Sequence, residues 1–347
     1  MGQDINIGFV GAGYWGGKLL PKFLAAPRVS IGAVCDTHPA NRQEIETKYP
    51  HIRTVSSIDA LLERNEIDAV VIVTPPSTHY ALAKKALEAG KHVWIEKPLA
   101  LQLNEGYELV RIARHADAII FVDHTFLYDP AVSMIRDLIQ GGELGEIYHL
   151  YLQRLNLGRI KRDSNVWWNS APHDASIVLH LLPGPPKSVH LHGYRYLQPS
   201  LEDLNMAIIE MSDGTSAFVY HSWLFPENTA RLTVIGSKRF VVYEGKFDKR
   251  SVTVFDYELD LSKECTTAGE LPTTIPSKIT STRNLEGFQS SEPLSAAVDD
   301  FLAAIRSGKK PVSDGEFSLR VLALLEAGER SLRACGERMP VEIQHLG

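Results

Sequence analysis

The chain of 347 residues lacks several features that mark specialised classes of protein. It has only three cysteines, Cys35, Cys265 and Cys335, which are odd in number and far apart. This usage argues against a disulfide framework and a cysteine-based zinc site, and it predicts a reducing, cytoplasmic location. No apolar run in the sequence approaches the roughly 20 residues that a membrane-spanning helix needs. We therefore expect no membrane partner.

Signals for nucleic-acid binding, export and metal binding are missing as well. The formal net charge is −6, and no cluster of lysines and arginines forms a basic field, so we expect no nucleic-acid partner. The opening residues enter a strand-like run without the basic region, apolar core and cleavage site of a signal peptide. His190 and His192 share a predicted strand face without an evident third ligand, so no metal is expected.

The length and a hydrophobic content of 44% allow two domains with separate cores. In the first 123 residues, short apolar runs rich in β-branched residues alternate with helix patterns. Near-continuous apolar runs are typical of parallel strands buried on both faces, and the alternation predicts a doubly wound α/β sheet. The predicted strands are Ile5–Val10, Ile31–Cys35, Ala69–Val73, His92–Glu96 and Ala118–Val122.

The pattern changes near residue 123, which divides a first domain, 1–123, from a second, 124–347. The second domain is predicted to be α+β with a large, mostly antiparallel sheet, because its strand signals are close in sequence. Residues 265–293 form a polar excursion, and two final helices can pack back on the first domain. The predicted helices are Ala131–Gln140, Leu294–Ser307 and Glu316–Cys335. The predicted strands are an alternating segment within Glu146–Gly158, then Ser188–Tyr196, Ala207–Met211, Ser216–Trp223, Arg231–Ile235 and Ser251–Tyr257.

A glycine-rich turn follows the first predicted strand. Gly11, Gly13 and Gly16 have the G-x-G-x-x-G spacing of a Rossmann dinucleotide-binding turn, which brings a pyrophosphate close to the backbone and to a helix N-terminus. Asp36 follows at about the 20-residue spacing expected for a carboxylate on the adenosine ribose. Such an acid repels a 2′-phosphate and no arginine follows directly, so NAD is favoured over NADP. Asp36 can alternatively be a solvated turn residue.

Lys97 follows a predicted parallel strand, at the edge of the sheet where ligands bind in this fold. A lysine at that edge can hydrogen-bond a substrate hydroxyl and stabilise the developing oxyanion. It can equally be a surface lysine ahead of a turn proline, Pro98.

His173 lies behind Pro172 in "NVWWNSAPHDASI", where we predict a helix capped by Asn169 or Ser170. In the first turn of that helix, the dipole would keep the imidazole neutral and able to act as a general base. The alternative is a core histidine on one stripe with Ile177. Asp174 can supply a charge to His173 or simply complement the helix dipole.

As an ordered set, five motifs resemble the Gfo/Idh/MocA family of NAD(P)-dependent oxidoreductases, over about residues 4 to 335. The motifs are GAGYWG (Gly11–Gly16), Asp36, TPPSTH (Thr74–His79), EKP (Glu96–Pro98) and PHD (Pro172–Asp174). Three further segments look most like the branch that acts at C3 of nucleotide-linked or amino sugars. They are HTFLYDPAV (His124–Val132), GELGEIY (Gly142–Tyr148) and RLNLG (Arg154–Gly158).

The resemblance implies a site with a catalytic histidine, His173, and with a lysine, Lys97, that contacts cofactor and substrate before a cis-proline. Many relatives carry aspartate where this chain has Asn169, so the charge that steadies an imidazolium is missing. The expected catalytic residues are Lys97, His173, Asn169 and Asp174. The expected cofactor-binding residues are Gly11, Gly13, Tyr14, Trp15, Gly16, Asp36, Thr74, Pro75, Pro76, His79, Glu96 and Lys97. The expected substrate-binding residues are Lys97, Tyr128, Arg154, Asn156, Asn165 and His173.

The functional hypothesis is an NAD-dependent dehydrogenase that oxidises a secondary alcohol of a sugar or sugar nucleotide. One alternative is a hydrolase or epimerase that uses bound NAD for a transient oxidation. The other is a non-catalytic regulator that senses NAD or a sugar, which Asn169 motivates. The resemblance also implies a homodimer or homotetramer.

Overall fold

The computed structural model describes residues 4–246, 249–259, 275, 277–288 and 292–344, which fall into two compact units. The first unit comprises Met1–Asp129, Ser291–Ala327 and Val341–Gly347, so it extends past residue 123 and takes in a late helix. The second comprises Pro130–Ser290 and Gly328–Pro340. In the part of the chain that is described, no helix combines the length and the apolarity that crossing a membrane requires.

The first unit is built on a six-stranded parallel sheet in the order β3-β2-β1-β4-β5-β6. This order is that of the Rossmann fold, and it confirms the predicted doubly wound sheet. Since the chain reverses its direction of winding between β1 and β4, ligands are expected at the carboxyl ends of the strands near that point. The strands are β1 (Ile5–Val10), β2 (Val29–Cys35), β3 (Thr54–Val55), β4 (Ala69–Ile72), β5 (His92–Ile95) and β6 (Ile120–Val122).

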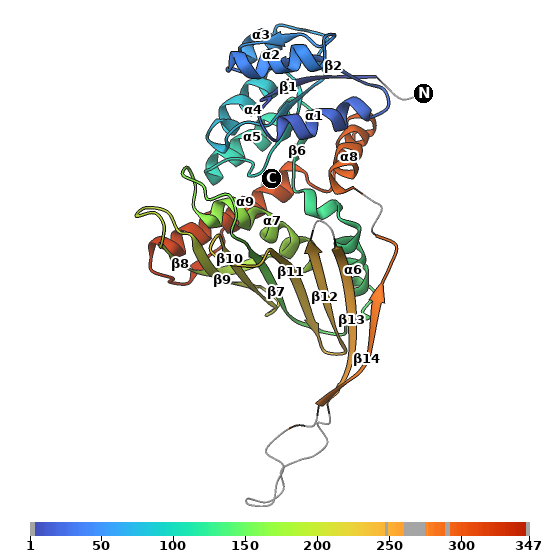
Figure 1. Cartoon of the computed structure of the whole chain (residues 1–347), viewed down its shortest axis with the longest axis vertical. Helices are drawn as coiled ribbons and strands as arrows, with labels where there is room; N and C mark the ends of the chain where they lie inside the picture. The colour runs from blue at the N-terminus through green and yellow to red at the C-terminus, as the bar shows by residue number, and fades with distance from the viewer. Residues whose placement is uncertain (1–3, 247–248, 260–274, 276, 289–291, 345–347) are drawn as a thin grey trace, which may run out of the picture. The chain divides into compact units, whose positions relative to one another are not determined.

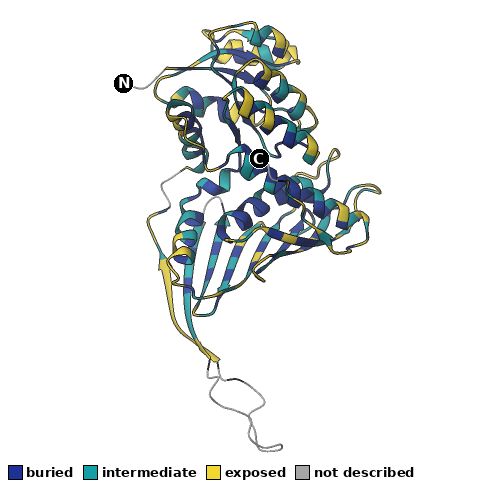
Figure 2. Cartoon of the chain, turned by 180° about the vertical axis from the view of Figure 1, so that it is seen from behind, coloured by how far each residue is buried: buried dark blue, intermediate teal, exposed yellow. Residues whose placement is uncertain are grey.

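Helices cover both faces of this sheet, and a separate apolar cluster fills each interface. On one face the rings of Phe23, Trp94 and Phe301 meet edge to face at 5.4–6.3 Å. The strands between the helices are the dark, buried ribbons of Figure 2, which explains their near-continuous apolar sequences. The helices are α1 (Gly16–Ala25), α2 (Pro39–Lys48), α3 (Ile58–Leu62), α4 (His79–Glu88), α5 (Leu103–His115), α8 (Pro293–Ser307) and α9 (Gly315–Arg333), of which α9 continues into the second unit.

The second unit contains a nine-stranded sheet in the order β14-β13-β12-β11-β7-β10-β9-β8-β15. Strands β7 and β10 pair in parallel, whereas the other neighbours pair antiparallel, as predicted (Figure 1). Helix α7 (Val166–Leu181) packs against β7, β9 and β10, and α6 (Pro130–Gln140) packs against α7. The strands are β7 (Ile147–Leu155), β8 (Pro186–Tyr194), β9 (Leu204–Met211), β10 (Ser216–Ser222), β11 (Thr229–Gly236), β12 (Arg239–Lys246), β13 (Lys249–Leu259), β14 (Ser277–Leu285) and β15 (Met339–Pro340).

Three strands of this sheet are absent from the sequence prediction, among them the two-residue strand β15. Strand β12 was not predicted, and β14 lies within 265–293, where we predicted an excursion without strands. The prediction is wrong for β14 because this edge strand is exposed along nearly its whole length, so its sequence has no apolar alternation to detect. Other parts of the excursion, 265–274, 276 and 289–291, lie outside the described residues.

Helix α7 (Val166–Leu181) begins earlier than predicted. Its N-cap is Asn165, whose side-chain oxygen accepts a hydrogen bond from the backbone N–H of Trp168 at 3.1 Å. Burial of Val166 and Trp167 fixes this first turn, which leaves Pro172 inside the helix. His173 therefore lies about two turns from the helix N-terminus. The predicted effect of the helix dipole on its imidazole is wrong, since that effect fades within the first turn.

The cap makes a prediction about stability. Asn165 also donates through Nδ2 to Glu202 at 3.1 Å and Glu329 at 3.3 Å. Asn165→Ala should therefore destabilise the fold by about 1–2 kcal/mol, seen as a lower midpoint in urea unfolding followed by circular dichroism. Ser164→Ala, which removes a neighbouring hydroxyl outside the cap, is the control. An unchanged midpoint would contradict the capping role and favour the substrate-binding role expected from the sequence.

Candidate functional site

The glycine-rich turn after β1 has the geometry of a pyrophosphate cradle. Gly11 has a φ of +99°, and a Cβ at this position would lie 2.4 Å from the carbonyl oxygen of Val73. A Cβ on Gly16 would lie 2.1 Å from the carbonyl oxygen of Gly11. By contrast, a Cβ on Gly13 would meet no atom within 4 Å. The backbone at Gly13 is thus open to a bound group, so the turn fits a dinucleotide.

Two exposed aromatic residues border this turn. The rings of Tyr14 and Trp15 meet edge to face at 5.3 Å. The Nζ atom of Lys18 lies 4.5 Å from the centre of the Tyr14 ring and 5.1 Å from that of Trp15. The border therefore offers both apolar surface and a cation next to the helix N-terminus, which suits the pyrophosphate of a dinucleotide.

Asp36, directly after β2, accepts several hydrogen bonds that hold the neighbouring turn together. Its Oδ2 accepts from the backbone N–H of Ala12 at 2.8 Å and from Asn41 at 3.0 Å, while its Oδ1 accepts from the N–H of His38 at 2.8 Å. Burial opposes ionisation, but these hydrogen bonds lower the pKa of Asp36 overall. The carboxylate is consequently charged at neutral pH and joins the two turns that a dinucleotide would touch.

Arg42 brings a positive charge to the same turn. One guanidinium nitrogen, Nη1, donates to the carbonyl oxygens of Asp36 at 2.7 Å and Thr37 at 3.2 Å. Arg42 does not directly follow Asp36 in the sequence and was not predicted, because the first turn of α2 places it next to Asp36. Asp36 suits free ribose hydroxyls, whereas Arg42 suits a 2′-phosphate. The preference between NAD and NADP thus depends on which of the two residues dominates.

His79 lies between two loops of the first unit rather than on their surface. Its ring is fully buried, with Nε2 at 2.9 Å from the Thr74 carbonyl oxygen and Nδ1 at 2.8 Å from that of Pro98. Burial lowers the pKa of His79 against the opposing effect of the two carbonyls. His79 therefore connects the loop at Thr74 to the loop that carries Lys97. The cofactor contact expected of Thr74–His79 is left to the other residues of that segment.

Lys97 follows β5 at the carboxyl edge of the sheet, and the Lys97–Pro98 bond is cis, as the resemblance implied. Asp123 and His124 follow the adjacent strand β6, since Ile95 pairs with Val122. Burial first, and then the charge of Lys97, lower the pKa of His124 to about 3, so this histidine is neutral. The sequence analysis missed Asp123 and His124, although their position directly after a strand was a usable signal.

Tyr128, an expected substrate ligand, lies in the short helix η2 (Thr125–Tyr128) of the first unit. Its hydroxyl donates to Asp300 Oδ2 at 2.7 Å, and the same oxygen accepts from the N–H of Val312 at 2.9 Å. Burial and Asp300 raise the pKa of Tyr128. The hydroxyl is thus already engaged with α8.

In the second unit, α7 places Asn169 and His173 four residues apart on one face, and both are partly exposed. The next residue, Asp174, is buried and points elsewhere. Its carboxylate binds Arg154 through Nη2 at 2.8 Å and Nε at 3.2 Å, and it lies 2.8 Å from Nε2 of His221. Although burial opposes ionisation, these partners lower the pKa of Asp174. The charge of Asp174 is therefore committed to Arg154 and His221.

A row of polar residues crosses three adjacent strands beneath α7. Arg154 on β7 pairs with His221 on β10, which pairs with Asn205 on β9. Nδ1 of His221 lies 3.0 Å from Oδ1 of Asn205, which extends the network. Asn156, directly after β7, is partly exposed. His221 and Asn205 were not predicted from the sequence, because each lies within a largely apolar strand and belongs to no motif.

Comparison with protein families decides the classification. Residues 5–124 match the oxidoreductase family with an NAD-binding Rossmann fold, and residues 132–242 match the GFO/IDH/MocA C-terminal domain. The chain belongs to the Gfo/Idh/MocA oxidoreductase family. Its first unit therefore carries an NAD-binding Rossmann domain, in agreement with the open cradle at Gly13 and with Asp36.

Similar proteins include enzymes with different substrates. The chain is 28% identical to a UDP-N-acetylglucosamine 3-dehydrogenase of Acidithiobacillus ferrooxidans, over 92% of this chain and 94% of that protein. A crystal structure of that bacterium's enzyme superposes with a TM-score of 0.79 at 25% identity, covering 96% of this chain and 99% of the other.

A second relative is a 1-carboxy-3-chloro-3,4-dihydroxycyclohexa-1,5-diene dehydrogenase of Comamonas testosteroni, at 28% identity over 63% of this chain. The chain spans only 58% of the length of that relative. One relative is thus named for a nucleotide sugar and the other for a carbocyclic diol. The substrate of this chain does not follow from its family alone.

The opposed charges of Asp36 and Arg42 predict a switch of cofactor. Asp36→Ser should weaken NAD binding by about 10- to 150-fold, because hydrogen bonds to a charged group contribute roughly 1.5–3 kcal/mol, and it should strengthen NADP binding through Arg42. Dissociation constants from titration calorimetry measure both effects.

Two further variants complete this experiment. Adding Arg42→Met to Asp36→Ser should abolish the gain for NADP, while Glu88→Gln, which removes one exposed negative charge, should change neither constant. An Asp36→Ser variant that still prefers NAD as strongly as the wild type would show that Asp36 does not set the preference.

Proposed function

We propose that this chain is an NAD-dependent dehydrogenase that oxidises a secondary alcohol of a sugar or sugar nucleotide to a ketone. C3 of a nucleotide-linked amino sugar is the first position to test, because one relative that matches over nearly its whole length is named for that reaction. The observation that carries the proposal is the position of Lys97 directly after β5, at the carboxyl edge of the Rossmann sheet.

In this proposal Lys97 and His173 act on the same hydroxyl. The Lys97 ammonium donates a hydrogen bond to the hydroxyl oxygen and stabilises the negative charge that develops there. His173 accepts the hydroxyl proton as the C–H bond breaks. Bound NAD supplies the acceptor for the hydride, which leaves the same carbon with its electron pair. The products are a ketone, NADH and a proton on His173, so atoms and charges balance.

The residue one turn before His173 supports this role with an amide instead of a carboxylate. Asn169 lies one turn earlier on the same helix face, so its amide can orient the imidazole but adds no negative charge. Asp174 is held by Arg154 and His221. Arg154 remains partly exposed and could pair with a phosphate or carboxylate of the substrate.

Two other functions make different predictions. A hydrolase or epimerase that oxidises its substrate transiently would retain its cofactor tightly and would release no NADH. A non-catalytic sensor would bind NAD without turnover, and Lys97→Ala would not change its output. This function is considered because position 169 carries an amide, Asn169, and not a carboxylate.

The assigned roles predict the kinetics of two variants. In a screen of sugars and nucleotide sugars for NADH formation, Lys97→Ala should lower kcat by about 10²–10³-fold and His173→Ala by about 10²–10⁴-fold. Lys91→Ala, at the opposite end of β5, and His51→Ala, on an exposed turn, are matched controls that should retain full activity. Full activity of either active-site variant on a good substrate would rule out the role given to that residue.

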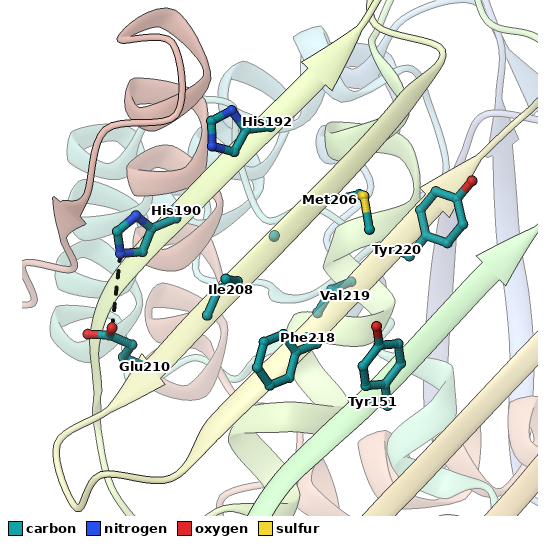
Figure 3. A pocket seen from close by; sticks show the side chains of 10 residues that line it. Tyr151, His190, His192, Met206, Ile208, Glu210, Phe218, Val219 and Tyr220 are labelled. Atoms are coloured by element: carbon teal, nitrogen blue, oxygen red, sulfur yellow. Dashed lines mark ion pairs between the residues drawn. The ribbon is translucent and has the colours of Figure 1, made fainter.

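We also propose that the chain forms a homo-oligomer through the face of the nine-stranded sheet that α7 leaves open. That face carries Tyr151, Met206 and Ile208, whose side chains are 41%, 51% and 39% exposed. Figure 3 shows them around a shallow hollow together with Phe218 and flanking polar residues. Adjacent exposed apolar residues of this kind are typical of protein interfaces.

The oligomer is tested by sedimentation velocity. Wild type should sediment as a dimer or larger, and Ile208→Lys should shift it to the monomer, because a charge would be buried at the interface. Leu197→Lys places the same charge on an exposed apolar residue outside the strands and should change nothing. A monomeric wild type at micromolar concentration, or an Ile208→Lys variant that stays assembled, would refute this interface.

A further inference from the structure

Two carboxylic acids meet at the carboxyl edge of the Rossmann sheet, next to Lys97. Strands β5 and β6 are paired in parallel with Ile95 opposite Val122, and the backbone N–H of Asp123 donates to the carbonyl oxygen of Ile95 at 2.9 Å. Glu96 and Asp123 each follow one of these paired positions, so their side chains leave neighbouring strands on the same face of the sheet, and each carboxyl affects the pKa of the other. The register of the sheet therefore sets this contact.

Two adjacent carboxyl groups can hydrogen-bond to each other only when one of them carries a proton, because ionised carboxylates only accept. Two ionised carboxylates would also repel each other strongly here, since Asp123 is only 2% exposed. The pair consequently holds one proton and one negative charge at neutral pH, as in other closely spaced carboxylates.

The contacts of the pair indicate where that proton resides. The hydroxyl of Thr125 donates to Oδ1 of Asp123 at 2.7 Å, which stabilises a charge on Asp123. Burial and the neighbouring Asp123 raise the pKa of Glu96. Burial also raises the pKa of Asp123, but Thr125, Glu96 and Lys97 oppose this rise. Glu96 is therefore the protonated member and Asp123 the ionised one.

Three other titratable groups near the pair are neutral. Burial and Lys97 keep His124 uncharged, burial and Lys97 likewise disfavour a charge on His79, and burial together with Asp300 keeps the Tyr128 phenol protonated. A single negative charge thus balances the Lys97 ammonium. A second one would oppose the negative charge that develops on a substrate oxygen, and the loss of both would leave the ammonium without its counter-charge.

We propose that Glu96 and Asp123 share one proton and act as positioning residues that present a single negative charge to Lys97. This inference rests on the proposed function, because it assigns the pair a purpose through that lysine. The sequence predicted a direct contact between Glu96 and the cofactor, which is a different role. If the two carboxyls share a proton, either one can carry the negative charge when the other is replaced.

Infrared difference spectroscopy detects the proton without any substrate or cofactor. The spectrum of the wild type minus that of Glu96→Gln at neutral pH should contain the C=O stretch of an un-ionised carboxylic acid. The same difference at high pH should lose this band and gain carboxylate bands, because rising pH removes the proton from Glu96. A difference spectrum with carboxylate bands alone at neutral pH would overturn the proposal.

Kinetics test the consequence for Lys97. Because one negative charge suffices, Glu96→Gln and Asp123→Asn should each lower kcat/KM only modestly, since the remaining carboxyl still carries that charge. The double variant has no such charge and should lose much more activity. The double variant should lose about tenfold or more beyond the product of the two single losses, a coupling of about 1.4 kcal/mol. Strictly multiplicative losses would show two independent carboxylates and refute the sharing.

The two proposals fail in different ways. An active Lys97→Ala variant would end the proposed function whatever the infrared result, whereas an inactive one combined with multiplicative losses at Glu96 and Asp123 would end only this inference. If the double variant does not fold, as judged by circular dichroism, the infrared comparison of wild type with Glu96→Gln still decides the matter.

Discussion

One electrostatic constraint underlies the candidate site, the placement of a lysine cation at the carboxyl edge of a buried parallel sheet. A charge there needs partners, because the strands beside it are almost wholly apolar. These partners are Glu96, directly after β5, and Asp123, directly after β6. The register between the two strands places them side by side. Neutral histidines complete the surroundings, so that the lysine keeps its charge for the substrate oxygen.

The same solution recurs elsewhere in the chain. The Asp36 carboxylate accepts hydrogen bonds from two backbone N–H groups and one side-chain amide. These bonds connect the glycine-rich turn to the turn that would contact the ribose. Asp174 collects Arg154 and His221 under α7. In each case an ionised carboxylate is held by several donors, which fixes loops or helices next to the residues assigned to chemistry. Rigid support of this kind allows a site to present its groups in one geometry.

The sequence predicted what repeats or has fixed spacing. The glycines at Gly11, Gly13 and Gly16 and the apolar runs of β1, β4 and β5 follow from local rules, and the structure confirms the fold they imply. Features that depend on contacts between residues far apart in the sequence, or that have no apolar pattern, were not predicted. Strand β14 is exposed and has no apolar pattern, α7 starts at Val166 because Trp167 finds a buried position, and His221 meets Asp174 only once helix and sheet are packed. Arg42 was missed for the same reason.

Chemical rescue at position 97 tests the central claim most directly. A Lys97→Cys variant treated with bromoethylamine carries an ammonium on a side chain of nearly lysine length, whereas treatment with iodoacetamide leaves a neutral group of similar size. Cys35 is buried and burial raises its pKa to about 11, so it should not react, and alkylated wild type accounts for Cys265 and Cys335. The account predicts that the ammonium adduct alone recovers NADH formation. Equal activity of the neutral adduct would contradict it.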